Sequence, residues 1–344
     1  MRGRPRVFKA MPAALRLQPA PPVAMFVAAA ILMAPTASAV AQQASVVFVG
    51  DVMLDEVAGE DIARGSDPLL PFAALLGAAD LAVGNLECPV STGGRAVDKV
   101  YTFQANPRVL PIVARHLGAV TLANNHSGDQ GPGALVQTMD RLRAAGIPFF
   151  GAGRDLAQAH APLILERGGL RIALLGYDEF KPRSFEAGPS SPGIAWSEDE
   201  QVVADIRAAR ALGADVVIPV VHWGWEKEPD PCPRQRDLAR RMIDAGADAV
   251  VGGHPHVTQG AEIYKGRPIL YSLGNFVFSG FPAGPCRTGW MLRLVLDRQG
   301  VVRWDTVVAR IDDRGVPHPD PGAASPCGAR NEEGVKSCKE DQGR

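Results

Sequence analysis

The chain has 344 residues, of which 46% are hydrophobic, 21% are charged and 6% are aromatic. This composition is typical of a globular protein and excludes an intrinsically disordered or collagen-like chain. The 36 lysines and arginines nearly balance the 37 aspartates and glutamates, which excludes a strongly basic nucleic-acid-binding protein.

The first 39 residues have the layout of a secretory signal peptide, in which basic residues precede an apolar segment. Five basic residues are followed by an uncharged run over residues 22–40 that ends in small side chains. We expect cleavage after Ala39, with Ala41 as a second site, and export to the periplasm or the extracellular space. The alternative is an uncleaved signal that anchors the chain in the membrane. Cleavage after Ala39 leaves 31 basic and 37 acidic residues, a net charge of −6.

From residue 45 onward, short apolar runs alternate with amphipathic stretches, which is the pattern of β-sheets covered by helices. In chain order, buried strands are predicted at residues 45–49, 80–83, 119–123, 171–176, 215–221, 248–251, 261–264, 268–272, 289–297 and 301–311. Helices are predicted at residues 107–117, 132–145, 198–212 and 233–246, several of them ended by a glycine. These elements form one domain over residues 40–312. The composition then turns to proline, glycine and charge, which predicts a flexible tail over residues 313–344.

Polar side chains stand at the ends of five of the predicted strands. In an open α/β sheet the ligand site lies outside the carboxyl ends of the strands, so we expect these side chains to meet. They are Asp51, Glu87, Asn125, His222, His254 and His256. Mixed nitrogen and oxygen ligands suit Mn, Zn, Fe or Mg. The pattern predicts two divalent metal ions, a pair that generates hydroxide near neutral pH for a hydrolytic reaction.

Five cysteines in an exported chain permit two disulfides and leave one thiol free. Cys327 and Cys338 close a short loop in the polar tail, and Cys232 and Cys286 each lie in a proline-rich loop. We predict these two pairs. Cys88 is predicted to be a small buried residue.

Several motifs, taken together and in order, resemble the CapA family, which is associated with poly-γ-glutamate capsule synthesis and export. The motifs are Gly50–Leu54 (GDVML), Asn85–Glu87 (NLE), Ala123–His126 (ANNH) with Asp129 and Gly131, His222–Gly224 (HWG) with Glu226, Gly253–Val257 (GHPHV) with Gln259 and Gly260, and Ser272–Phe276 (SLGNF). The resemblance runs from about residue 45 to residue 312.

That family is similar in fold to the calcineurin-like metallophosphoesterases. The resemblance implies an α/β fold, a metallophosphoesterase-like αββα sandwich of two mixed β-sheets flanked by helices. It also implies one ion held by Asp51, Glu87 and His256, and another held by Glu87, Asn125, His222 and His254. His126 resembles the histidine that acts as an acid or stabilises an oxyanion, and Asp129 is its orienting partner.

The chain departs from the metallophosphoesterase pattern in two motifs. The usual Asp-x-His reads Asp51-Val52-Met53, so one histidine ligand is replaced, and Glu87 stands where the second motif has aspartate. These departures bear on activity more than on fold.

Further residues are predicted to define the pocket. They are Lys99, Tyr101, Asn124, Trp223, Glu226 and Asn275. Lys99, Tyr101 and Phe103 alternate as if on one strand face, and Lys99 either pairs with a substrate anion or is a solvated lysine on an edge strand. Trp223 is expected at a wall of the cleft. Asn275 is expected to contact the substrate or the loop backbone.

Two functions remain as hypotheses. The first is an exported metal-dependent hydrolase in which a metal-bound hydroxide attacks a phosphoester or a γ-glutamyl bond. The second is a non-catalytic, metal-binding accessory protein for polyglutamate synthesis or export. The expected partners are an anionic polymer or a phosphoester substrate and membrane-bound capsule synthesis proteins, with no nucleic acid.

Overall fold

The computed structural model describes residue 18, residues 42–180 and residues 182–339. The predicted signal peptide, its cleavage sites and residues 340–344 of the predicted tail therefore lie outside the described residues, apart from Gln18. Within the described part of the chain, no helix has both the length and the apolar character needed to cross a bilayer.

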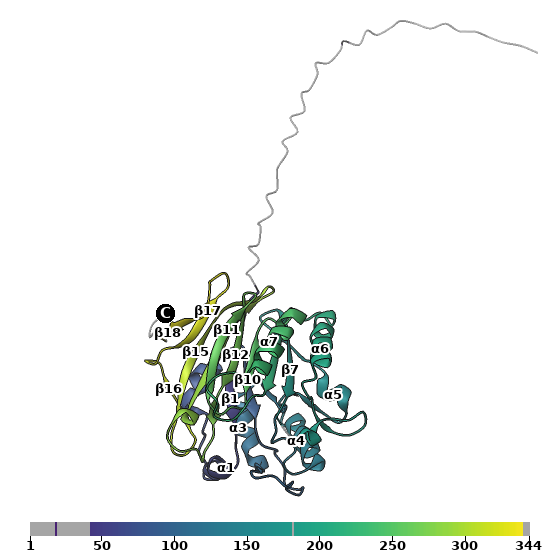
Figure 1. The fold of residues 1–344 in the computed structure, drawn as a ribbon, viewed down its shortest axis with the longest axis vertical. Coiled ribbons are helices and arrows are strands. Elements are labelled where there is room, and N and C mark those ends of the chain that lie inside the picture. Colours follow the sequence, from purple (N-terminus) through teal and green to yellow (C-terminus); the bar gives the residue numbers. More distant parts are fainter. Residues whose placement is uncertain (1–17, 19–41, 181, 340–344) are drawn as a thin grey trace, which may run out of the picture. The chain divides into compact units, whose positions relative to one another are not determined.

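Two mixed sheets are built from the apolar runs (Figure 1). The first sheet has ten strands, in the spatial order β18 (Lys336–Cys338), β17 (Ser325–Ala329), β15 (Gly300–Ile311), β14 (Thr288–Asp297), β1 (Ala44–Val52), β2 (Leu81–Leu86), β3 (Ala119–Thr121) and β4 (Phe149–Phe150), with β13 (Asn275–Val277) on β1 and β16 (Pro317–Asp320) on β15. The second has six, in the order β11 (Thr258–Tyr264), β12 (Arg267–Leu273), β10 (Val250–Gly253), β9 (Val216–His222), β7 (Leu170–Asp178) and β6 (Leu163–Arg167). A separate two-stranded antiparallel sheet pairs β5 (Ala152–Gly153) with β8 (Gly193–Ile194).

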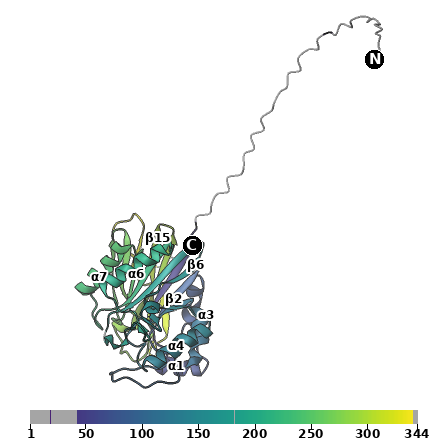
Figure 2. The same cartoon turned by 90° about the vertical axis from the view of Figure 1, so that its right-hand side faces the viewer.

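Helices cover the outer faces of the two sheets (Figures 1 and 2). The first sheet carries α1 (Glu56–Ala63), α2 (Ala73–Gly77), α3 (Leu110–His116) and α4 (Pro132–Ala144), and the second carries α5 (Leu156–His160), α6 (Asp199–Ala211) and α7 (Pro233–Ala245). Short 3₁₀ turns lie at Leu70–Phe72, Pro107–Val109, Arg183–Phe185 and Pro285–Arg287. The layers confirm the predicted αββα sandwich.

Continuous apolar strands are explained by burial on both faces. In β1, Val46 and Phe48 belong to the core between the sheets, whereas Val47 and Val49 belong to the core under the helices.

Gly246 adopts φ 117° at the C-cap of α7, a left-handed conformation that glycine adopts without steric cost. The helix ends there, as its glycine predicts.

The C-terminal segment corrects the predicted tail. Residues 317–338 contribute β16, β17 and β18 to the first sheet instead of forming a flexible extension. Prolines at 317, 319 and 326 hid these strands from sequence patterns. Pro317 and Pro319 are tolerated because β16 is an edge strand that pairs with β15 on one side, and Pro326 lies outside the residues of β17 that pair with β15. The disulfide between Cys327 and Cys338 joins β17 to β18.

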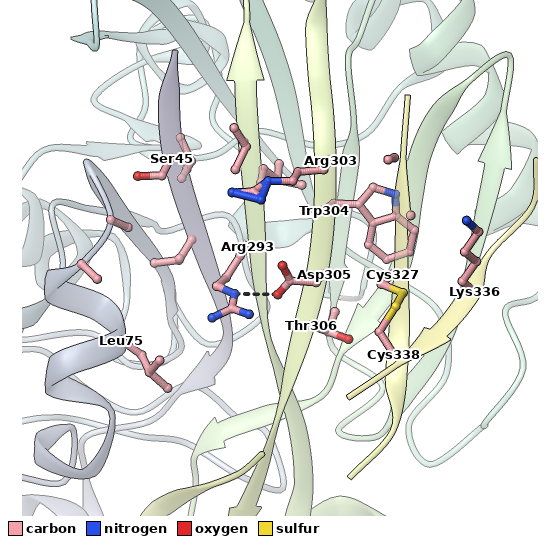
Figure 3. A pocket seen from close by; sticks show the side chains of 18 of the residues that line it. Ser45, Leu75, Arg293, Arg303, Trp304, Asp305, Thr306, Cys327, Lys336 and Cys338 are labelled. Carbon is pink, nitrogen blue, oxygen red and sulfur yellow. Dashed lines mark hydrogen bonds and ion pairs between the residues drawn. A yellow bond between two sulfur atoms is a disulfide. The ribbon is translucent and has the colours of Figure 1, made fainter. Parts of the chain in front are cut away.

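This disulfide borders a groove of about 800 Å³ on the first sheet (Figure 3). Leu75 of α2 lies along another side, and Arg293 forms an ion pair of 2.6 Å with Asp305 across β14 and β15. None of the predicted metal ligands lines this groove.

The predicted disulfide between Cys232 and Cys286 is wrong for this structure, in which both thiols are free. Cys232 is the N-cap of α7, where its backbone N–H donates to Gln235 Oε1 at 2.9 Å. Cys286 lies in a 3₁₀ turn and its carbonyl accepts from Asn275 Nδ2 at 2.9 Å. Each cysteine therefore has a local structural role.

Thiol titration checks this assignment. We expect Ellman's reagent to detect Cys232 and Cys286 in the native oxidised protein, because both are partly exposed. Cys88 should react only after unfolding, since it is 1% exposed and burial raises its thiol pKa, which disfavours the reactive thiolate. A native protein without reactive thiols would instead indicate the pair.

An ion pair connects α1 to the C-terminal segment and gives a pH prediction. Arg314 Nε donates to Asp61 Oδ2 at 2.6 Å, and the hydrogen bonds from Arg314 and Arg64 lower the Asp61 pKa to about 2. The unfolded carboxyl titrates near pH 3.9, so the stabilisation is present above about pH 4 and is lost as the pH falls through about 2. Asp61→Asn should therefore lower the melting temperature at pH 7, with a difference that shrinks in acid.

Differential scanning fluorimetry between pH 7 and pH 2 measures this difference. Asp140→Asn is the control, because the Asp140 side chain is 49% exposed and its ion pair with Arg154 is on the surface. A difference for Asp61→Asn that is constant across this range would contradict the prediction.

Candidate metal centre

The predicted site residues come from both sheets, whereas the sequence pattern predicts them at the edge of a single sheet. Asp51 lies in β1 and Glu87 directly follows β2, both in the first sheet. His222 ends β9 and His254 directly follows β10, both in the second. The strands of both sheets bring their polar ends together, and His254 N donates to Asp51 Oδ2 across the junction at 3.4 Å.

Glycines allow the backbones to approach at this junction. A Cβ on Gly50 would lie 1.8 Å from the carbonyl oxygen of Gly274, which no side chain could accommodate. The next amide, Asp51 N–H, donates to that same oxygen at 3.0 Å. Gly50 therefore fixes β1 against the turn before β13 and places the Asp51 carboxylate.

One group of ligand atoms contains two carboxylates and one imidazole. Asp51, Glu87 and His256 each offer an atom, all within 4.8 Å of one another and all in buried residues. His256 Nδ1 lies 3.6 Å from Asp51 Oδ2 and 2.8 Å from Asn275 Oδ1. Asn85 Nδ2 donates to the other Asp51 oxygen at 2.8 Å, which orients that carboxylate.

A second group shares Glu87. His222 Nε2 lies 2.9 Å from Asn125 Oδ1, 3.1 Å from His254 Nδ1 and 3.7 Å from Glu87 Oε1. Glu87 thus stands between the two groups, the position that a shared ligand would occupy. The structure brings together all six residues that the sequence predicts as metal ligands.

Two buried polar atoms indicate what this arrangement would hold. Glu87 Oε1 and His254 Nε2 have no hydrogen-bond partner among the described residues. A buried polar atom without a partner is costly, and coordination to a cation would satisfy both a carboxylate oxygen and an imidazole nitrogen. The residues therefore fit divalent metal ions.

The electrostatics agree with a cation site. Burial, and then the neighbouring Asp51 carboxylate, raise the Glu87 pKa well above its ordinary value. Burial lowers the pKa of His222 and of His254 well below the ordinary value, with the nearby histidines acting in the same direction. Neutral imidazole is the form that binds metal, so these histidines are held in the ligating state.

The backbone of the His-Pro-His segment is held in an unusual conformation. His254 has φ 94° and His256 has φ 58°, values that residues other than glycine rarely adopt. Strained backbone conformations of this kind cluster at functional sites, where the surrounding structure enforces them. Phe180 packs on His254 with ring centroids 3.9 Å apart, and Phe281 packs on His256 at 5.1 Å.

His126 and Asp129 form a hydrogen-bonded pair beside the ligands. His126 Nδ1 lies 2.7 Å from Asp129 Oδ2, and His126 Nε2 lies 4.0 Å from Glu87 Oε1. A carboxylate only accepts, so Nδ1 carries the proton that it donates to Asp129. The ring presents Nε2 toward Glu87, one of the predicted metal ligands.

The predicted pocket residues fall into two groups. Asn124 and Asn275 are fully buried, and both donate hydrogen bonds to the protein. Asn124 Nδ2 donates to Asn85 Oδ1, and Asn275 Nδ2 donates to the Cys286 carbonyl. Trp223 is in the core, where its Nε1 donates to the Tyr271 carbonyl at 2.9 Å, so it is not a cleft wall. Tyr101 is 68% exposed and Glu226 is also exposed.

The expectation that Lys99, Tyr101 and Phe103 share a strand face is wrong. Residues 99–103 form an irregular segment without strand pairing. Lys99 reaches Asp129, Tyr101 is exposed, and Phe103 packs on His126 with ring centroids 4.5 Å apart. The alternation reflects an irregular turn over His126, not a pleated strand.

Sequence reasoning missed Asp178 at the end of β7. It lies beside His222 in the strand register, and both of its carboxylate oxygens lack a hydrogen-bond partner among the described residues. Burial raises its pKa well above the ordinary value. The signal was available, because an apolar strand over residues 171–176 runs into this aspartate as other strands run into the predicted ligands.

The fold defines the class. Two mixed sheets between helix layers form a metallophosphoesterase-like αββα sandwich, and carboxylates, amides and imidazoles meet at its strand ends. The 5′-nucleotidase precursor of Thermus thermophilus shares this fold, with a TM-score of 0.52 and 16% identity, over 80% of this chain and 56% of that chain.

The chain belongs to the bacterial capsule synthesis protein family PGA_cap, whose model matches residues 45–280. The PGA biosynthesis protein CapA of Bacillus subtilis (strain 168) is 35% identical over 67% of this chain and 62% of its own length. The capsule biosynthesis protein CapA of Bacillus anthracis is 32% identical over 69% of this chain and 60% of its own length. The match thus spans about three fifths of these relatives, and the resemblance to the CapA family is confirmed.

Proposed function

We propose that this protein is a metal-dependent hydrolase of poly-γ-glutamate or capsule metabolism that cuts a phosphoester or a γ-glutamyl bond. The observation that carries the proposal is the shared position of Glu87. Its carboxylate belongs to the buried group with Asp51 and His256, lies 3.7 Å from His222 Nε2, and keeps one oxygen without a partner among described residues.

One ion would be held by Asp51, Glu87 and His256. A second would be held by Glu87, Asn125, His222 and His254. Divalent ions bound by these ligands would supply Lewis-acid chemistry for a hydrolytic reaction. The protein's own residues orient the ligands: Asn85 binds Asp51, and Asn275 binds His256.

His126 supplies the acid in this proposal. With the imidazole protonated on both nitrogens, Nε2–H faces Glu87 and would deliver its proton to the departing oxygen or nitrogen of the substrate. Nδ1–H donates to Asp129 Oδ2 at 2.7 Å, so the ring keeps its Nδ1 proton when Nε2 gives up its own. Phe103 packs on the ring and limits its rotation.

A second candidate is a non-catalytic metal-binding accessory protein for polyglutamate synthesis or export. It is favoured by Met53, which stands where the metallophosphoesterase motif has a histidine. Met53 is fully buried in the core under the helices, and its sulfur accepts from Asp55 N at 3.2 Å. Because methionine stands in this position, the first metal site has one imidazole fewer.

Export and an anionic polymer or phosphoester substrate complete the proposal, with membrane-bound capsule synthesis proteins as further partners. A mature net charge of −6 would repel polyglutamate over most of the surface. Bound metal ions would supply the local positive charge that attracts the polyglutamate chain to the site. The lack of an excess of basic residues supports the absence of a nucleic-acid partner.

Metal content and hydrolysis of the mature chain, residues 40–344, test the two candidates. We expect about two ions per chain by inductively coupled plasma mass spectrometry, and turnover of a phosphodiester or of a γ-glutamyl anilide. His254→Ala and His256→Ala should each lose metal and activity, whereas His318→Ala, at an exposed ion pair, should retain both. Bound metal without hydrolysis of either substrate would favour the accessory protein.

A further inference from the structure

Lys99 is surrounded by acceptors that belong to the protein. Its Nζ donates to the backbone carbonyl of Asn125 at 2.7 Å and to Asp129 Oδ1 at 2.9 Å. It also lies 3.2 Å from His126 Nδ1, but that nitrogen carries the proton donated to Asp129 and therefore does not accept. The Lys99 side chain is 17% exposed and that of Asp129 is fully buried.

Among the described residues, the hydrogen-bond donors to the Asp129 carboxylate all come from this neighbourhood. Oδ1 accepts from Lys99, and Oδ2 accepts from His126 Nδ1 and from Phe103 N–H at 2.9 Å. A buried carboxylate that loses its cation is left with an uncompensated charge, which is strongly unfavourable. Lys99 is thus the cation that pairs with the Asp129 carboxylate, whose other oxygen accepts the hydrogen bond from His126 Nδ1.

The segment that carries Lys99 is hydrogen-bonded at several points to the loop that contains Asp129 and Gln130. Arg95 N donates to the Gln130 carbonyl at 3.1 Å, and Val97 N donates to the Asp129 carbonyl at 2.9 Å. Gln130 Nε2 in turn donates to the Phe103 carbonyl at 3.2 Å. We name residues 95–104 the strap.

We propose that Lys99 is a positioning residue that fixes the His126–Asp129 pair relative to the metal-binding Asn125. This inference rests on the proposed function. A single ammonium joins the backbone of Asn125, whose side chain contacts His222, to the carboxylate that orients His126. Lys99 therefore sets the distance between the proton donor and the metal centre, and two of its three N–H groups donate to the protein.

The separate effects of a Lys99 variant on kcat and on KM distinguish a positioning role from substrate binding. Lys99→Met should lower kcat by about 10²-fold, the scale of a misplaced catalytic group, with KM within about twofold and metal content unchanged. Val100→Ala is the matched control, because Val100 is 86% exposed, and it should leave both constants unchanged. A raised KM with an unchanged kcat would overturn the proposal.

Hydrogen exchange of the metal-free protein gives a readout that does not depend on activity. Lys99→Met should accelerate exchange of the Phe103 and Val97 amides by about tenfold, because both donate to Asp129, and Val100→Ala should not. Unchanged protection would overturn the positioning role. If wild-type protein hydrolyses nothing, the proposed function fails while the exchange experiment still decides the role of Lys99.

A double variant guards against misfolding from an unpaired buried carboxylate. Asp129→Asn removes that charge, so Lys99→Met with Asp129→Asn should fold, as checked by circular dichroism. Residues that act as a unit are not additive, so the double variant should lose about as much kcat as the worse single variant. Losses that multiply would show that Lys99 acts independently of Asp129 and would overturn the proposal.

Discussion

Replacing Glu87 by glutamine is expected to change the metal-bound and the metal-free protein in opposite directions. Metal affinity should fall by more than about 10²-fold, because changes in residues that merely orient a ligand already cost 10–100-fold. The metal-free protein should become more stable at neutral pH. Its wild-type carboxylate is fully buried and has an oxygen without a partner among the described residues, and glutamine removes the charge.

The pH dependence of the metal-free protein follows from the same carboxyl group. Burial raises the Glu87 pKa, so protonation stabilises the native state, and this stabilisation is lost as the pH rises through the raised pKa. The glutamine variant does not titrate at this position. Its advantage over wild type should therefore increase with pH above the ordinary glutamate pKa of about 4.3.

Urea unfolding in excess chelator, together with metal analysis after reconstitution, measures both effects. Glu166→Gln is the control, because Glu166 is exposed on β6. A Glu87→Gln protein that binds as much metal as wild type, or that is less stable without metal, would contradict the assigned role of Glu87.

The second large effect is expected for His126→Ala. Turnover should fall by about 10²- to 10⁴-fold, the usual contribution of a positioned general acid, while metal content stays at the wild-type level. The reason is geometric: Nδ1 is held by Asp129, and Nε2 lies 4.0 Å from Glu87 Oε1. The histidine is therefore beside the ligand set but outside it.

Steady-state kinetics and metal analysis of His126→Ala separate two roles. His116→Ala is a control with a buried histidine that pairs with Asp67, away from the predicted ligands. Metal loss in His126→Ala would identify His126 as a ligand, and an unchanged turnover would remove it from the reaction.

The sequence predicts which polar side chains meet at the strand ends better than it predicts the segments around them. Buried strands such as β1 and β9 are continuous apolar runs that end in Asp51 and His222, so the end of each run marks a candidate ligand. Which strands share a sheet is a long-range property. Local apolar patterns do not contain it, and the two-sheet arrangement came from the resemblance to a family.

Irregular segments follow a different rule, because their conformation is set by individual tertiary contacts. Lys99 and Phe103 look like alternate positions of a strand, yet each is placed by Asp129 or His126. Cys232 and Cys286 lie in similar loops, but flanking composition does not fix a disulfide partner. The short strands β16 to β18 depend on pairing with β15 and with one another, which no local pattern reveals.

The region that matches the family model ends at residue 280, but the first sheet continues with strands beyond that residue. Strand β14 begins at Thr288 and pairs with β1 from Ala44 to Val49, and it contributes Leu292, Leu294 and Leu296 to the core between the sheets. A fragment cut at residue 280 would leave β1 with a long apolar edge open to other chains, a hazard for aggregation. The residues that identify the family are thus fewer than the residues that must fold together, and the strand that carries Asp51 depends on sequence beyond the family's signature.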